Sequence, residues 1–176
     1  VMRWVDKEFL TIFSFPFAYG DDSALNEMNN AVLTRKIANQ LFKVDDARGK
    51  TFSYGGNLFQ VSAVIEDVPV NSHLQFDILL SYQKYIEVAR GFGGDADGSW
   101  GWSDFYTYVL LKEYADVNNV RMKLVDFADR HLGERMKASN FVNEFQLQPL
   151  LDIHTRSNYD YEFSGSGNYK YLDYVV

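Results

Sequence analysis

Residues 59–65, with the sequence FQVSAVI, indicate the fold more directly than any other stretch. The first, third, fifth and seventh residues of this run are apolar and alternate with more polar ones. That period of two predicts a strand with one buried face. Gly55-Gly56-Asn57 comes just before it and is typical of a hairpin turn. We therefore expect a β-hairpin here, with the longer strand lying in the core.

The segments upstream of this hairpin predict further strands and one short helix. Residues 1–5 and 31–33 are predicted as strands, and residues 7–10 as a helical turn. Thr34 is a predicted helix N-cap, because its hydroxyl can accept a hydrogen bond from a free backbone N–H group. The apolar face of the helix that follows, at helical spacing, consists of Ile37, Ala38, Leu41 and Phe42.

A second unit begins near residue 75 and has the predicted order β-α-β-α-β. Gly133 is predicted to end its second helix, and Pro149 its last strand. The fold class is therefore α+β, with one unit over residues 1–74 and another over residues 75–176. The predicted elements of the second unit are a strand at 76–80, a helix at 82–90, a strand at 106–111, a helix from Asp116 to about Leu132, and a strand at 145–148.

The composition argues against several classes of protein. The 17 basic and 24 acidic residues give a net charge of −7, whereas nucleic-acid and anionic lipid surfaces select clustered Lys and Arg. There is no Cys, which excludes disulfides, thiolate zinc sites and a Cys nucleophile. No apolar run approaches the about 20 residues of a membrane span. Because the chain opens at Val1 rather than Met, we expect a fragment of a longer protein.

Two glycine-containing motifs resemble nucleotide-binding loops only superficially. Gly49-Lys50-Thr51 matches the end of a P-loop, but Val44 stands where the first Gly is required, and two carboxylates would face the phosphates. We interpret it as the start of a strand after a loop. Residues 91–96 match G-x-G-x-x-A, but they follow a predicted helix rather than a strand. We interpret them as part of a surface loop over residues 91–101.

The same loop offers two weak binding signals. Asp95 and Asp97 suggest a calcium loop, but Tyr106 stands where an EF-hand requires a bidentate Glu. Trp100 and Trp102 could form a stacking platform for a sugar ring, and packing of both rings onto the following strand is the favoured alternative.

No catalytic, cofactor or metal site is predicted. His73, His131 and His154 form no H-E-x-x-H arrangement, and His131 is placed near a helix C-terminus. The sequence contains no G-x-S-x-G elbow. A cluster near the C-terminus, Tyr169, Lys170, Tyr171 and Tyr174, fits equally an approach to a membrane interface or a final amphipathic element.

Taken in order and spacing, many of these segments resemble the MacB-like periplasmic core domain of ABC transporter permeases, most closely the FtsX-type permeases of Bacteroidetes. The resemblance covers nearly the whole chain. Each motif is weak alone, and their order is fairly specific. The residues that carry it are Val5-Asp6, Phe9, Phe13, Gly20-Asp21, Ala31–Thr34, Ala38, Leu41-Phe42, Gly49-Lys50, Val61–Glu66, Pro69, Asn71–Asp77, Tyr106–Lys112, Leu147–Leu150 and Ile153-His154.

The resemblance implies a periplasmic domain of an inner-membrane protein that is not itself an enzyme. Residues 1–74 would form the smaller inserted α+β lobe. Residues 75–176 would form the returning half of a porter-like lobe that approaches a transmembrane helix, with the opening porter strands missing. The implied partners are a cytoplasmic ATPase subunit and a second permease copy. Some relatives also pair with a periplasmic adaptor and an outer-membrane channel.

Two functional hypotheses follow from these observations. In the first, the domain couples ATP-driven movement of membrane helices to the export or release of a cargo, without chemistry of its own. In the second, the chain is a secreted carbohydrate-binding module or carbohydrate-active enzyme, motivated by Trp100, Trp102 and the many carboxylates. The ordered motifs favour the first hypothesis.

Overall fold

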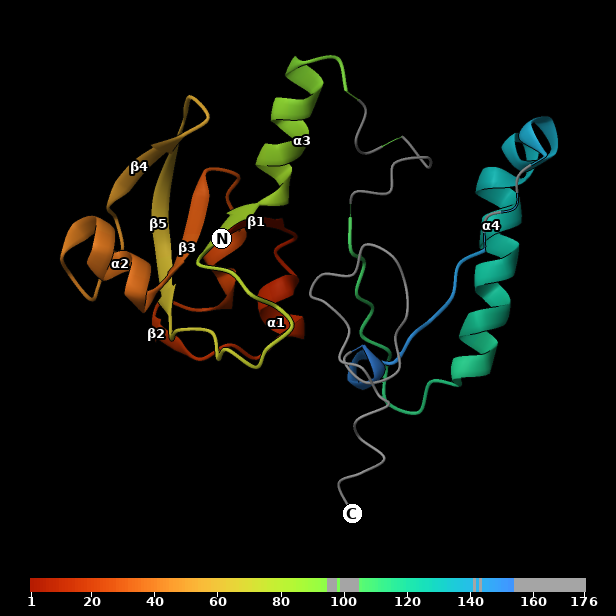
Figure 1. Ribbon diagram of the computed structural model, residues 1–176, viewed down its shortest axis with the longest axis horizontal. Helices are drawn as coiled ribbons and strands as arrows, with labels where there is room; N and C mark the ends of the chain where they lie inside the picture. Colours follow the sequence, from red (N-terminus) through yellow and green to blue (C-terminus); the bar gives the residue numbers. More distant parts are fainter. Residues whose placement is uncertain (95–97, 99–104, 141, 143, 154–176) are drawn as a thin grey trace. The chain divides into compact units, whose positions relative to one another are not determined.

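The computed structural model describes residues 1–94, 98, 105–140, 142 and 144–153. The chain divides into two compact units, Val1–Gly98 and Ser99–Val176, here called unit 1 and unit 2. Unit 1 contains a mixed sheet with short helices around it, and unit 2 contains one long helix (Figure 1). The α+β fold class predicted from the sequence is confirmed.

The sheet of unit 1 has the strand order β1-β6-β3-β5-β2, and β4 also pairs with β5. The pairs β1·β6 and β3·β5 are parallel, while β3·β6, β2·β5 and β4·β5 are antiparallel. The strands are β1 (Met2–Val5), β2 (Phe17–Tyr19), β3 (Asn30–Thr34), β4 (Thr51–Tyr54), β5 (Asn57–Ile65) and β6 (Ile78–Ser81).

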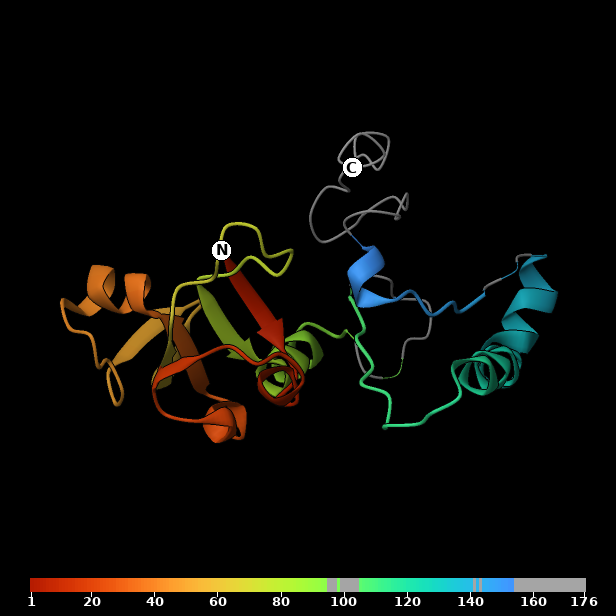
Figure 2. The same cartoon turned by 90° about the horizontal axis from the view of Figure 1, so that it is seen from below.

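Short helices cover the two faces of this sheet. Helix α2 (Arg35–Phe42) lies on one side, and α1 (Phe9–Ile12) with the 3₁₀ turn η1 (Asp22–Leu25) lies on the other (Figure 2). Helix α3 (Tyr82–Gly91) follows β6 directly and extends beyond the end of the sheet (Figure 1). Both sides of β3 and β5 are therefore covered, which places the core of unit 1 at these central strands.

Strand β5 confirms the prediction made for residues 59–65. Phe59, Ala63 and Ile65 are fully buried, and Val61 is 1% exposed. Val64 is also fully buried, although strict alternation places it on the opposite face. The reason is that the register between β3 and β5 shifts between Ala31 and Val32, which interrupts the alternation, so Val64 belongs to the same buried cluster as Val61.

The predicted hairpin turn joins β4 to β5. Gly55 and Gly56 have φ values of 57° and 79°, so both central residues adopt positive φ. This is the type I′ pattern, whose backbone twist matches that of two paired strands. Glycine reaches positive φ without the steric cost that a Cβ atom imposes, which explains why the sequence signal was reliable here.

Helix α2 begins as predicted but buries a narrower face. The Thr34 hydroxyl accepts from the Ile37 N–H at 3.4 Å, and Asp67 accepts from the Lys36 N–H at 2.9 Å. Ala38 is fully buried, whereas Leu41 is 53% exposed. The helix has only eight residues and ends with Lys43 in the left-handed conformation. Leu41 lies in its last turn and faces away from the sheet.

The two compact units divide at a different place from the predicted boundary at residues 74 and 75. Strand β6 follows that boundary, yet it pairs with β1 and β3 and so belongs to the sheet of unit 1. Residues 106–111 and 145–148 carry no strand, in contrast to the expectation, because they have no partner strand among the described residues of unit 2. Whether these parts form an inserted and a porter-like lobe stays a prediction.

Helix α4 (Val117–Ser139) is longer than predicted. Its N-cap is Asp116, as expected, with the carboxylate accepting from the Asn118 N–H at 2.9 Å. Gly133 does not end the helix but is buried within it, and the left-handed Asn140 forms the C-cap. A single Gly costs an exposed helix only about 1 kcal/mol, so the apolar stripe around Leu132 continues the helix past it.

Among the described residues, no helix combines the length and the apolar character needed to cross a bilayer.

Candidate functional site

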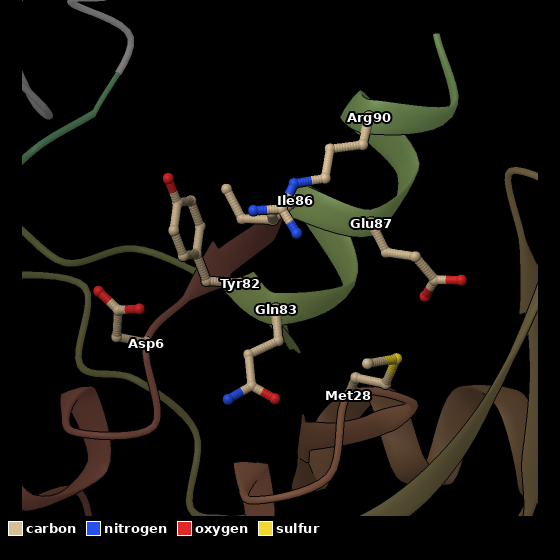
Figure 3. Close-up of a pocket in the computed structure, with 7 residues that line it drawn as sticks. All are labelled: Asp6, Met28, Tyr82, Gln83, Ile86, Glu87 and Arg90. Carbon is tan, nitrogen blue, oxygen red and sulfur yellow. The ribbon is translucent and has the colours of Figure 1, made fainter. Parts of the chain in front are cut away.

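A shallow groove lies on unit 1. Its volume is about 530 Å³. The residues that line it come from α3, from the end of β1 and from the segment before β3 (Figure 3). They are Asp6, Met28, Tyr82, Gln83, Ile86, Glu87 and Arg90.

The spacing of side chains along α3 builds most of this groove. Tyr82, Ile86 and Arg90 are each four residues apart, so they follow one side of the helix. Met28, 40% exposed, faces the helix from the segment between η1 and β3 (Figure 3). The floor is therefore apolar, formed by a Tyr ring, an Ile and a flexible Met side chain, and the rim is polar.

Charges on the rim of the groove are largely balanced. The Glu87 carboxylate lies 2.7 Å from Lys84 Nζ, and Lys84 is only 8% exposed although it carries a charged head. Asp6 and Arg90 add one charge of each sign. None of the lining residues is a Ser, Cys or His, so the groove provides no activated nucleophile.

The P-loop-like residues lie outside this groove and serve the sheet. Gly49 N–H donates to the Val61 carbonyl at 2.8 Å, and Val61 N–H donates to the Lys50 carbonyl at 2.8 Å. Strand β4 then begins at Thr51. These backbone groups are therefore committed to β5, which confirms the interpretation as a strand start after a loop.

The second glycine-containing motif closes helix α3. Gly93, with φ of 78°, donates its N–H to the Arg90 carbonyl at 3.0 Å, and Gly94 donates to Ala89 at 2.9 Å. It follows a helix rather than a strand, as expected, so it lacks the setting of a dinucleotide site. The other signals from the same stretch lie outside the described residues: Asp95, Asp97, Trp100 and Trp102.

Two of the three histidines, His73 and His131, lie among the described residues. His73 is half-buried in the loop before β6, and His131 lies on α4 with its ring 4.5 Å from that of Phe127. Because α4 continues to Ser139, His131 lies within the helix and not near its end, which corrects the predicted placement. His154 and the C-terminal Tyr cluster lie outside the described residues. Among the described residues, no three His, Asp or Glu side chains gather in a way that could hold a metal.

A charged cluster at the start of α2 was not anticipated from the sequence. Arg35 Nε lies 3.0 Å from Glu66, and a second guanidinium nitrogen contacts the other carboxylate oxygen. Asp45 lies 3.7 Å from the same guanidinium. The hydrogen bonds from Arg35 lower the pKa of Glu66 below its usual value, and those from Arg48 do the same for the pKa of Asp46. The cluster joins α2 to the end of β5.

This cluster predicts an acid-sensitive contribution to stability. A carboxylate with a lowered pKa in the folded state stabilises the protein above its unfolded pKa, and that stabilisation is lost as the pH falls. We expect the melting temperature to fall below about pH 4.5, and Glu66→Gln to remove part of that dependence. Thermal melts between pH 3 and 7 test this, with Glu8→Gln, an exposed carboxylate away from the cluster, as control. Parallel curves for wild type and Glu66→Gln would contradict it.

The sequence did not predict the groove either, because its lining residues come from separate segments. Tyr82, Ile86 and Arg90 lie within a helix that was predicted correctly. Met28 and Asp6 come from separate segments, however, and only the sheet brings them to α3. The i, i+4 spacing was the one available signal, and it identifies a helix face without saying what lies opposite it.

Several known structures have a similar fold, and two of them come from bacterial proteins. One is a domain of a protein described as a permease, from Porphyromonas gingivalis, with a TM-score of 0.57 and 23% identity. The other is the periplasmic region of MacB from Actinobacillus actinomycetemcomitans, with a TM-score of 0.51 and 11% identity. The alignments cover 74% and 81% of this chain, but only 58% and 66% of those proteins.

No curated protein matches the sequence. The family model of the MacB-like periplasmic core domain, in contrast, matches residues 1–127. That range contains the whole sheet of unit 1 and the first part of α4. The order of weak motifs noted in the sequence is thus reproduced by a model that spans most of the chain. The chain belongs to the family of MacB-like periplasmic core domains.

Proposed function

We propose that this chain is the extracytoplasmic domain of an ABC transporter permease and that it couples ATP-driven movement of membrane helices to export or release of a cargo. The observation that carries the proposal is the family match over residues 1–127. The domain acts mechanically and is not an enzyme.

The partners of the domain follow from the same proposal. A cytoplasmic ATPase subunit drives the permease, and a second permease copy faces this one. Residues 75–176 supply the returning half of a porter-like lobe and lead toward a transmembrane helix. The aromatic and β-branched residues at 106–111 and the alternating residues at 145–148 support this lobe assignment, since such segments are typical of strands that pair within a larger sheet.

The first test of the proposal is the parent reading frame. An apolar span of about 20 residues on each side of the domain is expected. Soluble sequence on both sides would contradict a permease.

The coupling itself is tested by a distance measurement between the units. The chain has no Cys, so labels can be placed at single introduced cysteines. Val70 in unit 1 is 97% exposed and Tyr114 in unit 2 is 95% exposed, so replacing either should leave packing intact. With spin labels at both sites in the parent permease, we expect the distance distribution to change between the nucleotide-free and ATP-trapped states.

A matched control uses two labels within unit 1, at Val70 and at Leu58, which is 63% exposed. That distance should stay constant in both nucleotide states. An unchanged Val70–Tyr114 distribution would mean that ATP does not move the units, and the coupling role would then be wrong even if the membrane spans are present.

A further inference from the structure

The β1 edge of the sheet in unit 1 could pair with a further strand. Among the described residues, strand β1 is the last strand in the order and pairs only with β6. The opposite edge is divided between two short strands, β4 and β2, which both pair with β5. Pro16 directly precedes β2, and the β2·β5 register shifts between Phe17 and Tyr19. Proline and register shifts are devices that block strand addition, and β1 has neither.

The register shows which backbone groups of β1 point outward. The Val1 carbonyl accepts from the Ile78 N–H at 3.1 Å, and Met2 pairs with Ile78. In a parallel pair, residues 1, 3 and 5 then direct their N–H and C=O groups toward β6. The N–H and C=O groups of Met2 and Trp4 point the other way, toward the open edge.

The side chains of these two residues are also only partly covered. Met2 and Trp4 pack against the buried cluster of Ala31, Phe59 and Leu80, but both remain half-exposed. The Trp4 ring centroid lies 6.0 Å from that of Phe59 and 5.9 Å from that of Tyr85. A strand added beside β1 would bury more of Met2 and Trp4 on this face of the sheet.

We propose that the β1 edge receives a β-strand from a part of the same permease outside this chain. The proposal rests on the proposed function, since it needs a longer parent protein. The Porphyromonas gingivalis domain supports this occupant, because this chain covers only 58% of its length. A second copy is disfavoured, because two-fold antiparallel pairing of β1 centred on Arg3 would place the two Arg3 side chains directly opposite each other.

The Trp4 backbone amide reports on this edge directly. In the isolated 176-residue chain it should exchange hydrogen quickly, while the Arg3 and Val5 amides, which face β6, are protected. In the parent permease the Trp4 amide should exchange at least about tenfold more slowly. Equal Trp4 exchange in both proteins would overturn the proposal. Slow exchange in the isolated chain together with a dimeric mass would also overturn it, in favour of a second copy.

A pair of Met2 variants provides the matched control. Met2→Pro removes an outward N–H and blocks strand addition, while the ladder to β6 does not use that group. Met2→Ala shortens the side chain and keeps the N–H. In the parent, Met2→Pro should abolish the extra protection of Trp4 and Met2→Ala should retain it. Loss of protection in both variants would overturn the proposal. The parent's membrane spans are established separately, so failure here leaves the permease assignment intact.

Discussion

Replacing Phe59 with Ala is expected to lower the free energy of unfolding by about 3–5 kcal/mol. Phe59 is fully buried and is among the largest buried side chains of the described residues. Its ring lies 5.8 Å from Phe52 and 6.0 Å from Trp4, so truncation removes contacts with β4 and β1 together. Because the three strands hold these rings in place, we expect the cavity to collapse only partly. Urea denaturation of the full chain measures the effect.

Leu58→Ala is the matched control for that measurement. Leu58 is the preceding residue of β5 and is 63% exposed. Its truncation should change the free energy of unfolding by less than about 0.5 kcal/mol. Similar losses for both variants would mean that strand propensity, rather than burial in the core, stabilises β5.

Gly20→Ala is expected to be the second large effect, with a loss of about 2 kcal/mol or more. Gly20 follows β2 with φ of 92°, a conformation that residues with a Cβ atom rarely adopt. A Cβ added there would lie 2.7 Å from Ala63 Cβ and 3.0 Å from the Ser62 carbonyl oxygen. Ala63 belongs to the central strand β5, so it cannot move aside without disturbing β3 and β2.

Gly49 separates the two causes of this loss. Its φ is 80°, similar to that of Gly20, but nothing lies within 4 Å of an added Cβ. Gly49→Ala should therefore report backbone strain alone, about 1 kcal/mol. Combining Gly20→Ala with Ala63→Gly should recover part of the steric component. If Gly20→Ala and Gly49→Ala are equally destabilising, the close approach to Ala63 contributes nothing.

Local signals in the sequence identified most elements of unit 1. The alternation along residues 59–65, the Gly55-Gly56 turn and the Thr34 cap each act over a few residues. Each signal has a cause within the segment itself: the alternation reflects the two-residue period of a strand, the turn needs positive φ, and the cap needs a hydroxyl that accepts a hydrogen bond. The same holds for Asp116 at the start of α4. The order of these elements was also enough to indicate the family.

Sequence patterns predicted secondary structure less well where the outcome depends on contacts with distant residues. Residues 106–111 are rich in aromatic and β-branched residues, as strands are, but have no partner strand in the described part of unit 2. Gly133 has the residue type of a helix end, yet the apolar stripe around Leu132 carries α4 past it. Both predictions were wrong, because the local residue preference did not decide the outcome.

The sequence by itself determined the fold class, the family and the positions of the central strands, because periodicity and turn chemistry are local properties. Only the tertiary structure decided that β6 joins the sheet of unit 1, that Asp6 and Met28 meet α3 in a groove, and that Arg35 pairs with Glu66. It also decided that the backbone groups of Met2 and Trp4 face the side of β1 opposite β6, where no other strand of the described residues lies. These features depend on strand order and register, which bring together residues far apart in the chain. The sequence around each of these residues does not predict which distant residue it will contact.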